Sequence, residues 1–180
     1  MKGIVFTEFL ELVESKFGLE MLDKIISESK LSSKGTYKPL GTYNFVEMLQ
    51  LLQSLSSNTS IPVDDLLLAF GEHFFSVLQI NYGNLLATYK GPIQMLSSIE
   101  NHIHVEVQKM YPKAELPTFI VEKKEKNSLV MLYKSSRAMH HFGLGLMYKT
   151  FSHFNASANI TMKKISEDGT EVRFLINKNI

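Results

Sequence analysis

The spacing of apolar residues changes at Pro117, and this change restricts the folds that the chain can adopt. Before it, apolar side chains recur at the period of α-helices in residues 7–17, 19–29, 44–55, 66–80 and 93–110. After it, the spacing predicts strands over residues 118–124, 128–135, 158–165 and 170–177, with a helix over residues 140–154 between the two pairs. This order predicts an α+β fold in one domain, residues 1–180, with a helical N-terminal half packed on a C-terminal half that carries a four-stranded antiparallel sheet.

Particular residues mark where elements start and turn. Asn44 followed by Glu47 has the pattern of a capping box, which predicts the start of the third helix. A shorter helical piece is predicted around residues 84–88. Asp168-Gly169 predicts the turn of the second hairpin.

Composition excludes several classes of protein. The formal net charge is +1, which gives no reason to expect a nucleic-acid or membrane-surface binder. The chain has no Cys, so disulfides, thiolate metal ligands and a Cys nucleophile are excluded. No apolar stretch approaches the roughly 20 residues of a membrane span and the start lacks a signal-peptide pattern, so we expect a cytoplasmic protein without membrane contact. The 12 Phe and 9 Met predict either a soft core or a cavity for a large flat ligand.

Three polar residues stand at the end of the second predicted strand. In an extended chain Tyr133, Ser135 and Arg137 would share one face, because alternate side chains point the same way. Two hydroxyls and a guanidinium, with no acid among them, suit a carboxylate or a phosphate. The alternative is an ordinary polar end of a strand.

Six histidines are the candidate metal ligands: His73, His102, His104, His140, His141 and His153. His102 and His104 are two apart on a predicted helix, so they point to different sides and cannot bind one ion together. No Ser-His-Asp order and no phosphate-binding glycine loop is present. A single histidine is nevertheless sufficient for haem, which supplies four nitrogens itself and carries two propionates that need partners.

Several segments together resemble the H-NOX family, the haem nitric oxide/oxygen-binding domains shared with soluble guanylate cyclase. The sequence Tyr133-x-Ser135-x-Arg137 matches the family signature, and similar pieces follow in order at residues 1–4, 104–110, around Pro117 and at 144–146. The resemblance extends over nearly the whole chain. It is greatest to the short stand-alone bacterial members.

The resemblance implies a haem b cofactor, ferrous protoporphyrin IX, buried between the two halves. It assigns His104 as the proximal ligand of the haem iron, a choice that periodicity alone leaves open. Tyr133, Ser135 and Arg137 take the role of the propionate clamp.

Further residues are placed around the haem by the same resemblance. Pro117 and Ile4 correspond to residues that pack on the porphyrin and distort it. Phe74, Phe142 and Leu146 correspond to the distal side or the pocket lining.

The resemblance also bears on which gas is bound. Oxygen-binding members carry a tyrosine nine residues after the signature tyrosine, and Phe142 stands there in this chain. Phe74 stands where those members have a supporting asparagine. Neither Phe can donate a hydrogen bond, so bound oxygen would be unsupported in an apolar setting. We therefore expect binding of nitric oxide, and of CO in vitro, with O₂ excluded.

The implied function is sensing rather than catalysis. NO would bind ferrous haem and break the bond between iron and His104, and the conformational change would regulate a separate histidine kinase or cyclic-di-GMP enzyme, as in bacterial two-component signalling. One alternative is a haem enzyme handling NO or peroxide. Such an enzyme needs a distal acid or base, and the apolar Phe74 and Phe142 therefore disfavour it. Another is a haem-free binding module for an anionic ligand.

Overall fold

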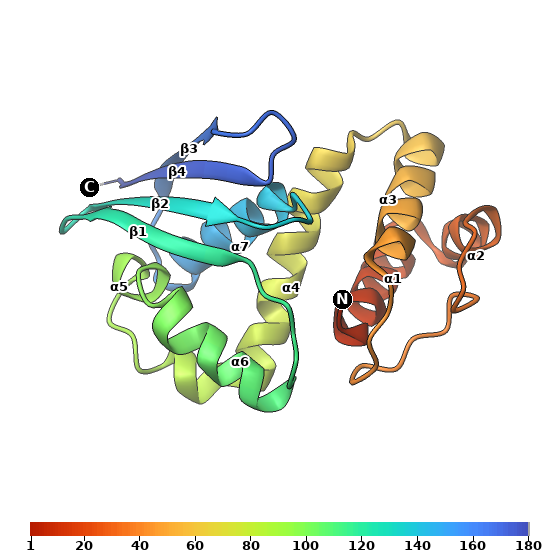
Figure 1. Cartoon of the computed structure of the whole chain (residues 1–180), viewed down its shortest axis with the longest axis horizontal. Coiled ribbons are helices and arrows are strands. Elements are labelled where there is room, and N and C mark those ends of the chain that lie inside the picture. Colours follow the sequence, from red (N-terminus) through yellow and green to blue (C-terminus); the bar gives the residue numbers. More distant parts are fainter. Residues whose placement is uncertain (180) are drawn as a thin grey trace. The chain divides into compact units, whose positions relative to one another are not determined.

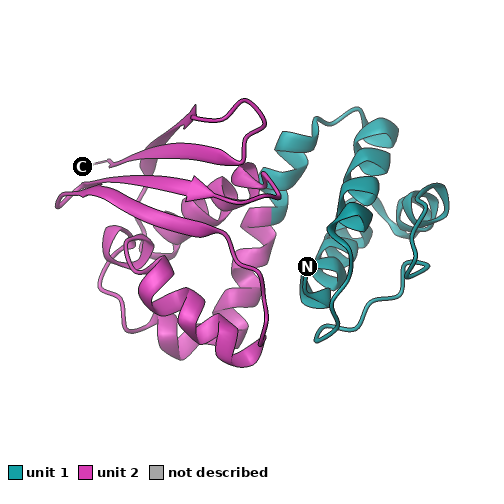
Figure 2. Ribbon diagram, in the orientation of Figure 1, with its two compact units in different colours: residues 1–70 teal, residues 71–180 magenta. Residues whose placement is uncertain are grey.

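The computed structural model describes residues 1–179 and divides into two compact units, Met1–Phe70 and Gly71–Ile180 (Figure 2). The helices of the first unit are α1 (Gly3–Phe17), α2 (Leu19–Glu28) and α3 (Phe45–Thr59). Helix α4 (Val63–Leu86) begins in the first unit and continues into the second. No helix among the described residues is long and apolar enough to cross a bilayer.

Unit 1 is built on apolar side chains from its three helices. Phe6, Phe9 and Ile25 are almost fully buried, as are residues on the inner side of α3. The ring of Phe6 stacks on Tyr37 with 4.4 Å between ring centroids. Tyr37 lies in the long connection between α2 and α3, so this stacking ties the connection to the core.

Glu47 anchors the connection between α2 and α3. Its side chain does not make the contact that the predicted capping box implies. Asn44 caps α3 as predicted, because its Oδ1 accepts a hydrogen bond from the Val46 amide at 3.0 Å. The Glu47 carboxylate, however, accepts hydrogen bonds from the hydroxyls of Tyr37 at 2.7 Å and Ser33 at 2.5 Å. It is 5% exposed, so the first turn of α3 holds a buried carboxylate that closes a loop.

Unit 2 contains the predicted antiparallel sheet, with strand order β1-β2-β4-β3 (Figure 1). The strands are β1 (Thr118–Lys124), β2 (Ser128–Lys134), β3 (Ala158–Lys164) and β4 (Glu171–Lys178). Alternate residues form a continuous apolar inner face: Phe119, Leu129, Met131, Tyr133, Ile160, Val172, Phe174 and Ile176. Helix α7 (His140–His153) lies against this face, and Gly143 on it sits beside the ring of Phe119.

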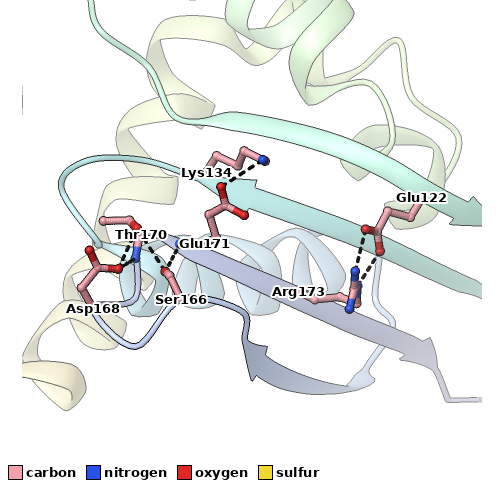
Figure 3. Close-up of polar contacts among 7 residues, drawn as sticks. All are labelled: Glu122, Lys134, Ser166, Asp168, Thr170, Glu171 and Arg173. Carbon is pink, nitrogen blue, oxygen red and sulfur yellow. Dashed lines mark hydrogen bonds and ion pairs between the residues drawn. The ribbon is translucent and has the colours of Figure 1, made fainter.

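The outer face of the sheet carries ion pairs (Figure 3). The register of β1 against β2 shifts between Val121 and Lys123, so Glu122 is the extra residue of a β-bulge. Its carboxylate accepts two hydrogen bonds from Arg173 on β4, at 2.6 and 2.9 Å. Lys134 pairs with Glu171 at 3.0 Å. These contacts join strands that are distant in sequence.

The region between Pro92 and Met110 is not the single long helix that periodicity predicts. It consists of α5 (Pro92–Leu96), a turn, a π-helix η1 (Ile99–Ile103) and α6 (His104–Met110). The hydroxyls of Ser97 and Ser98 both donate to the Gln94 carbonyl, at 3.0 and 2.9 Å. Such back-bonding competes with the helical ladder, so the helix is interrupted there.

Helix α4 is interrupted where Tyr82 has the non-helical dihedrals φ −130° and ψ 24°. This break separates the helix predicted over residues 66–80 from the shorter helical piece predicted around residues 84–88, which ends at Leu86.

Replacing the buried carboxylate tests the role of Glu47. We expect Glu47→Ala to lower the free energy of unfolding by about 2–3 kcal/mol, because it leaves two hydroxyls without their acceptor. Chemical denaturation measures this change. Glu11→Ala, at an exposed position of α1, is the matched control and should change stability by less than about 0.5 kcal/mol. Equal effects of the two substitutions would contradict the assignment.

The turn before β4 offers a pH test. Asp168 accepts hydrogen bonds from the Thr170 hydroxyl and amide (Figure 3), and these hold the pKa of its carboxyl at about 2. A depressed pKa stabilises the fold above the unfolded-state pKa of Asp, and this stabilisation is lost as pH falls through about 2. We expect Asp168→Asn to have a lower Tm than the natural chain at pH 5, with the difference vanishing near pH 2. A Tm difference that does not depend on pH would show that the charge contributes nothing.

Candidate functional site

The Tyr133–Arg137 segment turns where the sequence predicts an extended strand. Strand β2 ends at Lys134, and the amide of Ala138 donates to the Ser135 carbonyl at 3.2 Å. The shared extended face predicted for Tyr133, Ser135 and Arg137 is therefore wrong beyond Lys134. Ala138 follows with φ 50°, a left-handed conformation that no glycine in the sequence signals.

The turn nevertheless brings the three predicted residues together. The amide of Arg137 donates to the Ser135 hydroxyl at 3.2 Å. Tyr133 is 2% exposed, and burial raises the pKa of its hydroxyl, against the opposing effects of hydrogen bonds to Ser135 and the Met139 backbone. A neutral phenol and a second hydroxyl therefore lie beside a guanidinium, which is a donor set for an anion.

Arg137 also reaches the segment that leads into β1. Its Nη1 donates to the Glu115 carbonyl at 2.6 Å and its Nη2 to the Glu115 carboxylate at 2.5 Å. The Arg137 side chain is 16% exposed, whereas that of Glu115 is 82% exposed. Pro117, two residues further on, is half-buried directly before the strand. Arg137 thus fixes the chain next to Pro117.

His104 is the first residue of α6 and is mostly buried. Burial lowers the pKa of its imidazole, and the nearby Glu100 carboxylate opposes this effect. Its ring lies 6.1 Å from the ring of Phe119, which lies 5.4 Å from the ring of Tyr133, both measured between centroids. One aromatic ring therefore separates a neutral imidazole from the anion-binding donors.

His102 occupies a different environment. It is exposed, and its Nδ1 lies 2.8 Å from the Tyr89 hydroxyl. The two histidines therefore point to different sides, as predicted. Within residues 1–179, no group of three or more His, Asp or Glu side chains is placed to hold a metal ion.

Apolar side chains from α4 and α7 also meet within unit 2. The rings of Phe74 and Phe142 lie 5.5 Å apart between centroids. The helices can approach closely because residue 71 is a glycine. A Cβ at this position would lie only 2.1 Å from the Phe142 carbonyl oxygen. Leu146 packs against a neighbouring cluster formed by Phe75, Leu86, Tyr89 and Met95. Ile4 lies in unit 1, near the start of α1, and its predicted packing on haem stays a prediction.

Three residues of this region were missed by sequence reasoning. Glu100 could have been found, because it precedes His104 by four residues, a spacing that places side chains together on a helix. Glu115 contacts Arg137, which lies 22 residues further along the chain. Phe119 packs near both His104 and Tyr133. No local pattern signals either contact.

The donor set fits haem. A buried neutral imidazole can serve as one axial ligand, and hydroxyls with a guanidinium can hold propionates. Aromatic and aliphatic side chains, which a porphyrin requires for packing, are present in the same unit.

Comparison with known proteins agrees with this chemistry. The family model described as haem-NO-binding matches residues 2–162, which include parts of both units. The Fe(II) unliganded H-NOX protein from K. algicida is 70% identical, with a TM-score of 0.98 over 100% of this chain and 97% of that chain. The H-NOX from Shewanella woodyi, solved in the Fe(II)CO state with IWP-051 bound, is 36% identical, with a TM-score of 0.82 over 99% and 95% of the two chains.

More distant relatives share the fold or part of the length. An H-NOX protein from S. oneidensis in the Fe(II)NO state is 21% identical, with a TM-score of 0.91 over 100% of both chains, which shows a common fold. Soluble guanylate cyclase gcy-35 of Caenorhabditis elegans is 23% identical over 141 residues, and the match covers 77% of this chain but 20% of that protein. The chain thus spans about a fifth of the length of this curated relative. From the family model and the similar structures together, the chain belongs to the haem-NO-binding family, the H-NOX haem-based gas-sensor domains.

Proposed function

We propose that the chain binds haem b through His104, senses nitric oxide and regulates a separate signalling protein. The observation that carries this proposal is the placement of a buried neutral imidazole one aromatic ring away from the Tyr133–Ser135–Arg137 donors. Haem is a ligand that needs both an axial nitrogen and partners for two carboxylates. A haem-free module for a small anion would have no use for the imidazole.

In this proposal the clamp residues orient the cofactor. Tyr133, Ser135 and Arg137 hold the propionates by charge-assisted hydrogen bonds. Glu115 keeps the Arg137 side chain in place from the segment that precedes β1. Pro117 and Ile4 are proposed to press on the porphyrin, as the family resemblance implies.

The side chains proposed for the distal side select the gas. When bound, ferrous haem would supply an iron that can take a diatomic gas as a ligand. The rings of Phe74 and Phe142 lie 5.5 Å apart between centroids, and neither side chain can donate a hydrogen bond to a polar ligand such as O₂. NO and CO need no such donor. NO is a ligand of the S. oneidensis relative and CO of the S. woodyi relative.

Signal output is proposed to follow release of His104. Its helix, α6, leads directly into the segment that Arg137 holds, so a displaced His104 can move that segment and β1. The two arrangements must differ in affinity for a partner if the partner is to be regulated. The proposed partner is a histidine kinase or a cyclic-di-GMP enzyme on a separate chain, with both units acting as one sensor domain.

Spectra of the ferrous protein test the ligand and the gas. We expect a Soret band in the purified protein, and on NO addition the spectrum of an iron that has lost its histidine ligand. His104→Gly should lose the proximal histidine signature and regain a similar one with free imidazole. Stable oxygen binding in air, or a retained histidine bond under NO, would contradict the proposal.

Removing the guanidinium tests the clamp. We expect Arg137→Ala to speed haem dissociation roughly tenfold or more, because a charge-assisted hydrogen bond is worth about 1.5–3 kcal/mol. Transfer of haem to an excess of apomyoglobin measures this rate. Arg173→Ala, which removes an arginine paired with Glu122 on the outer face of the sheet, is the matched control and should leave the rate unchanged. Equal rates of haem dissociation for the two variants would show that Arg137 does not hold the haem.

A further inference from the structure

Glu100 contacts both the proposed iron ligand and the start of the sheet. Its Oε2 lies 3.5 Å from Nδ1 of His104. The same oxygen accepts a hydrogen bond from the Phe119 amide at 2.9 Å. Glu100 belongs to the π-helix η1, and Phe119 is the second residue of β1. One carboxylate therefore lies between the imidazole and the strand.

Nδ1 of His104 needs such a partner. It is shielded from solvent and makes no hydrogen bond of ordinary length within residues 1–179. A buried N–H without an acceptor costs about 1–3 kcal/mol. The contact of 3.5 Å is longer than the usual 2.7–3.2 Å. The Glu100 side chain is 43% exposed, so a small torsional change is enough to shorten the contact.

We propose that Glu100 is a positioning residue that fixes the tautomer and orientation of the His104 imidazole. The carboxylate accepts a hydrogen bond from Nδ1–H, which would leave the lone pair of Nε2 available to a haem iron. A histidine that ligates a metal commonly donates its other N–H to a carboxylate, which orients the ring and raises its basicity. This inference rests on the proposed binding of haem through His104.

The second contact of Glu100 gives this arrangement a mechanical consequence. Because the carboxylate also holds the Phe119 amide, the imidazole is connected to the first residues of β1. The ring of Phe119 packs near both His104 and Tyr133. If His104 were released from a haem iron, Glu100 would keep the imidazole attached to β1, so the movement of His104 would be passed to the sheet.

Two substitutions of Glu100 distinguish a role in positioning His104 from a purely structural role in holding β1. In Glu100→Gln the amide oxygen can still accept from the Phe119 amide, but the negative charge beside the imidazole is gone. Glu100→Ala removes both contacts. Glu106→Gln is the matched control, because Glu106 lies on the neighbouring helix α6 and pairs with Lys109 rather than with His104.

The measurement is resonance Raman spectroscopy of the ferrous haem-loaded full chain without added gas, together with its melting temperature. We expect Glu100→Gln to lower the iron–histidine stretching frequency while the melting temperature stays at the natural value. We also expect its haem to dissociate roughly tenfold faster, in keeping with the usual loss for such partners of a ligand. Glu106→Gln should change none of these.

The outcomes distinguish this inference from the proposed function. If the natural chain shows an iron–histidine band that His104→Gly abolishes, while Glu100→Gln leaves its frequency unchanged, Glu100 positions nothing and the haem proposal stands. If the natural chain shows no such band, the haem proposal itself is wrong. Should Glu100→Ala fail to fold, Glu100→Gln still decides, because it retains the contact with β1.

Discussion

The packing of Phe119 is the contact on which the candidate site depends. Its ring packs near those of His104 and Tyr133, and its amide donates a hydrogen bond to Glu100. The side chain is 8% exposed, on the inner face of the sheet against α7. Burial of one aromatic residue therefore sets the spacing between a helix that carries an imidazole and a turn that carries anion-binding donors.

Much of the fold could be predicted from the sequence, because the signals for it are local. The apolar run over residues 129–132 and the turn signal at Asp168-Gly169 can be read directly from the sequence, and the sheet forms as predicted. Prediction was wrong where local hydrogen bonds compete with the periodic pattern. At Ser97 and Ser98 the hydroxyls interrupt a helix that the apolar spacing would continue. At Ser135 the chain turns without a glycine or proline to signal it.

The candidate site was less accessible to local reasoning. Periodicity could show that His102 and His104 point apart, but the choice of His104 came from resemblance to a family. The structure adds the environment of each site residue, which neither periodicity nor the family resemblance could provide. Contacts such as that between Arg137 and Glu115 connect residues far apart in the chain. They follow from how β1 and β2 pair, and only tertiary structure reveals them.

The β-bulge at Glu122 has a consequence for how the sheet meets other molecules. Strand β1 is at one edge of the sheet, and an edge strand with regular spacing is a template on which another chain can add a strand. The extra residue interrupts the row of amides and carbonyls there and increases the local twist. Consecutive lysines, Lys123 and Lys124 on β1 and Lys163 and Lys164 on β3, place charge on both edges. The sheet is thereby protected from edge-to-edge aggregation while its inner face remains available for packing.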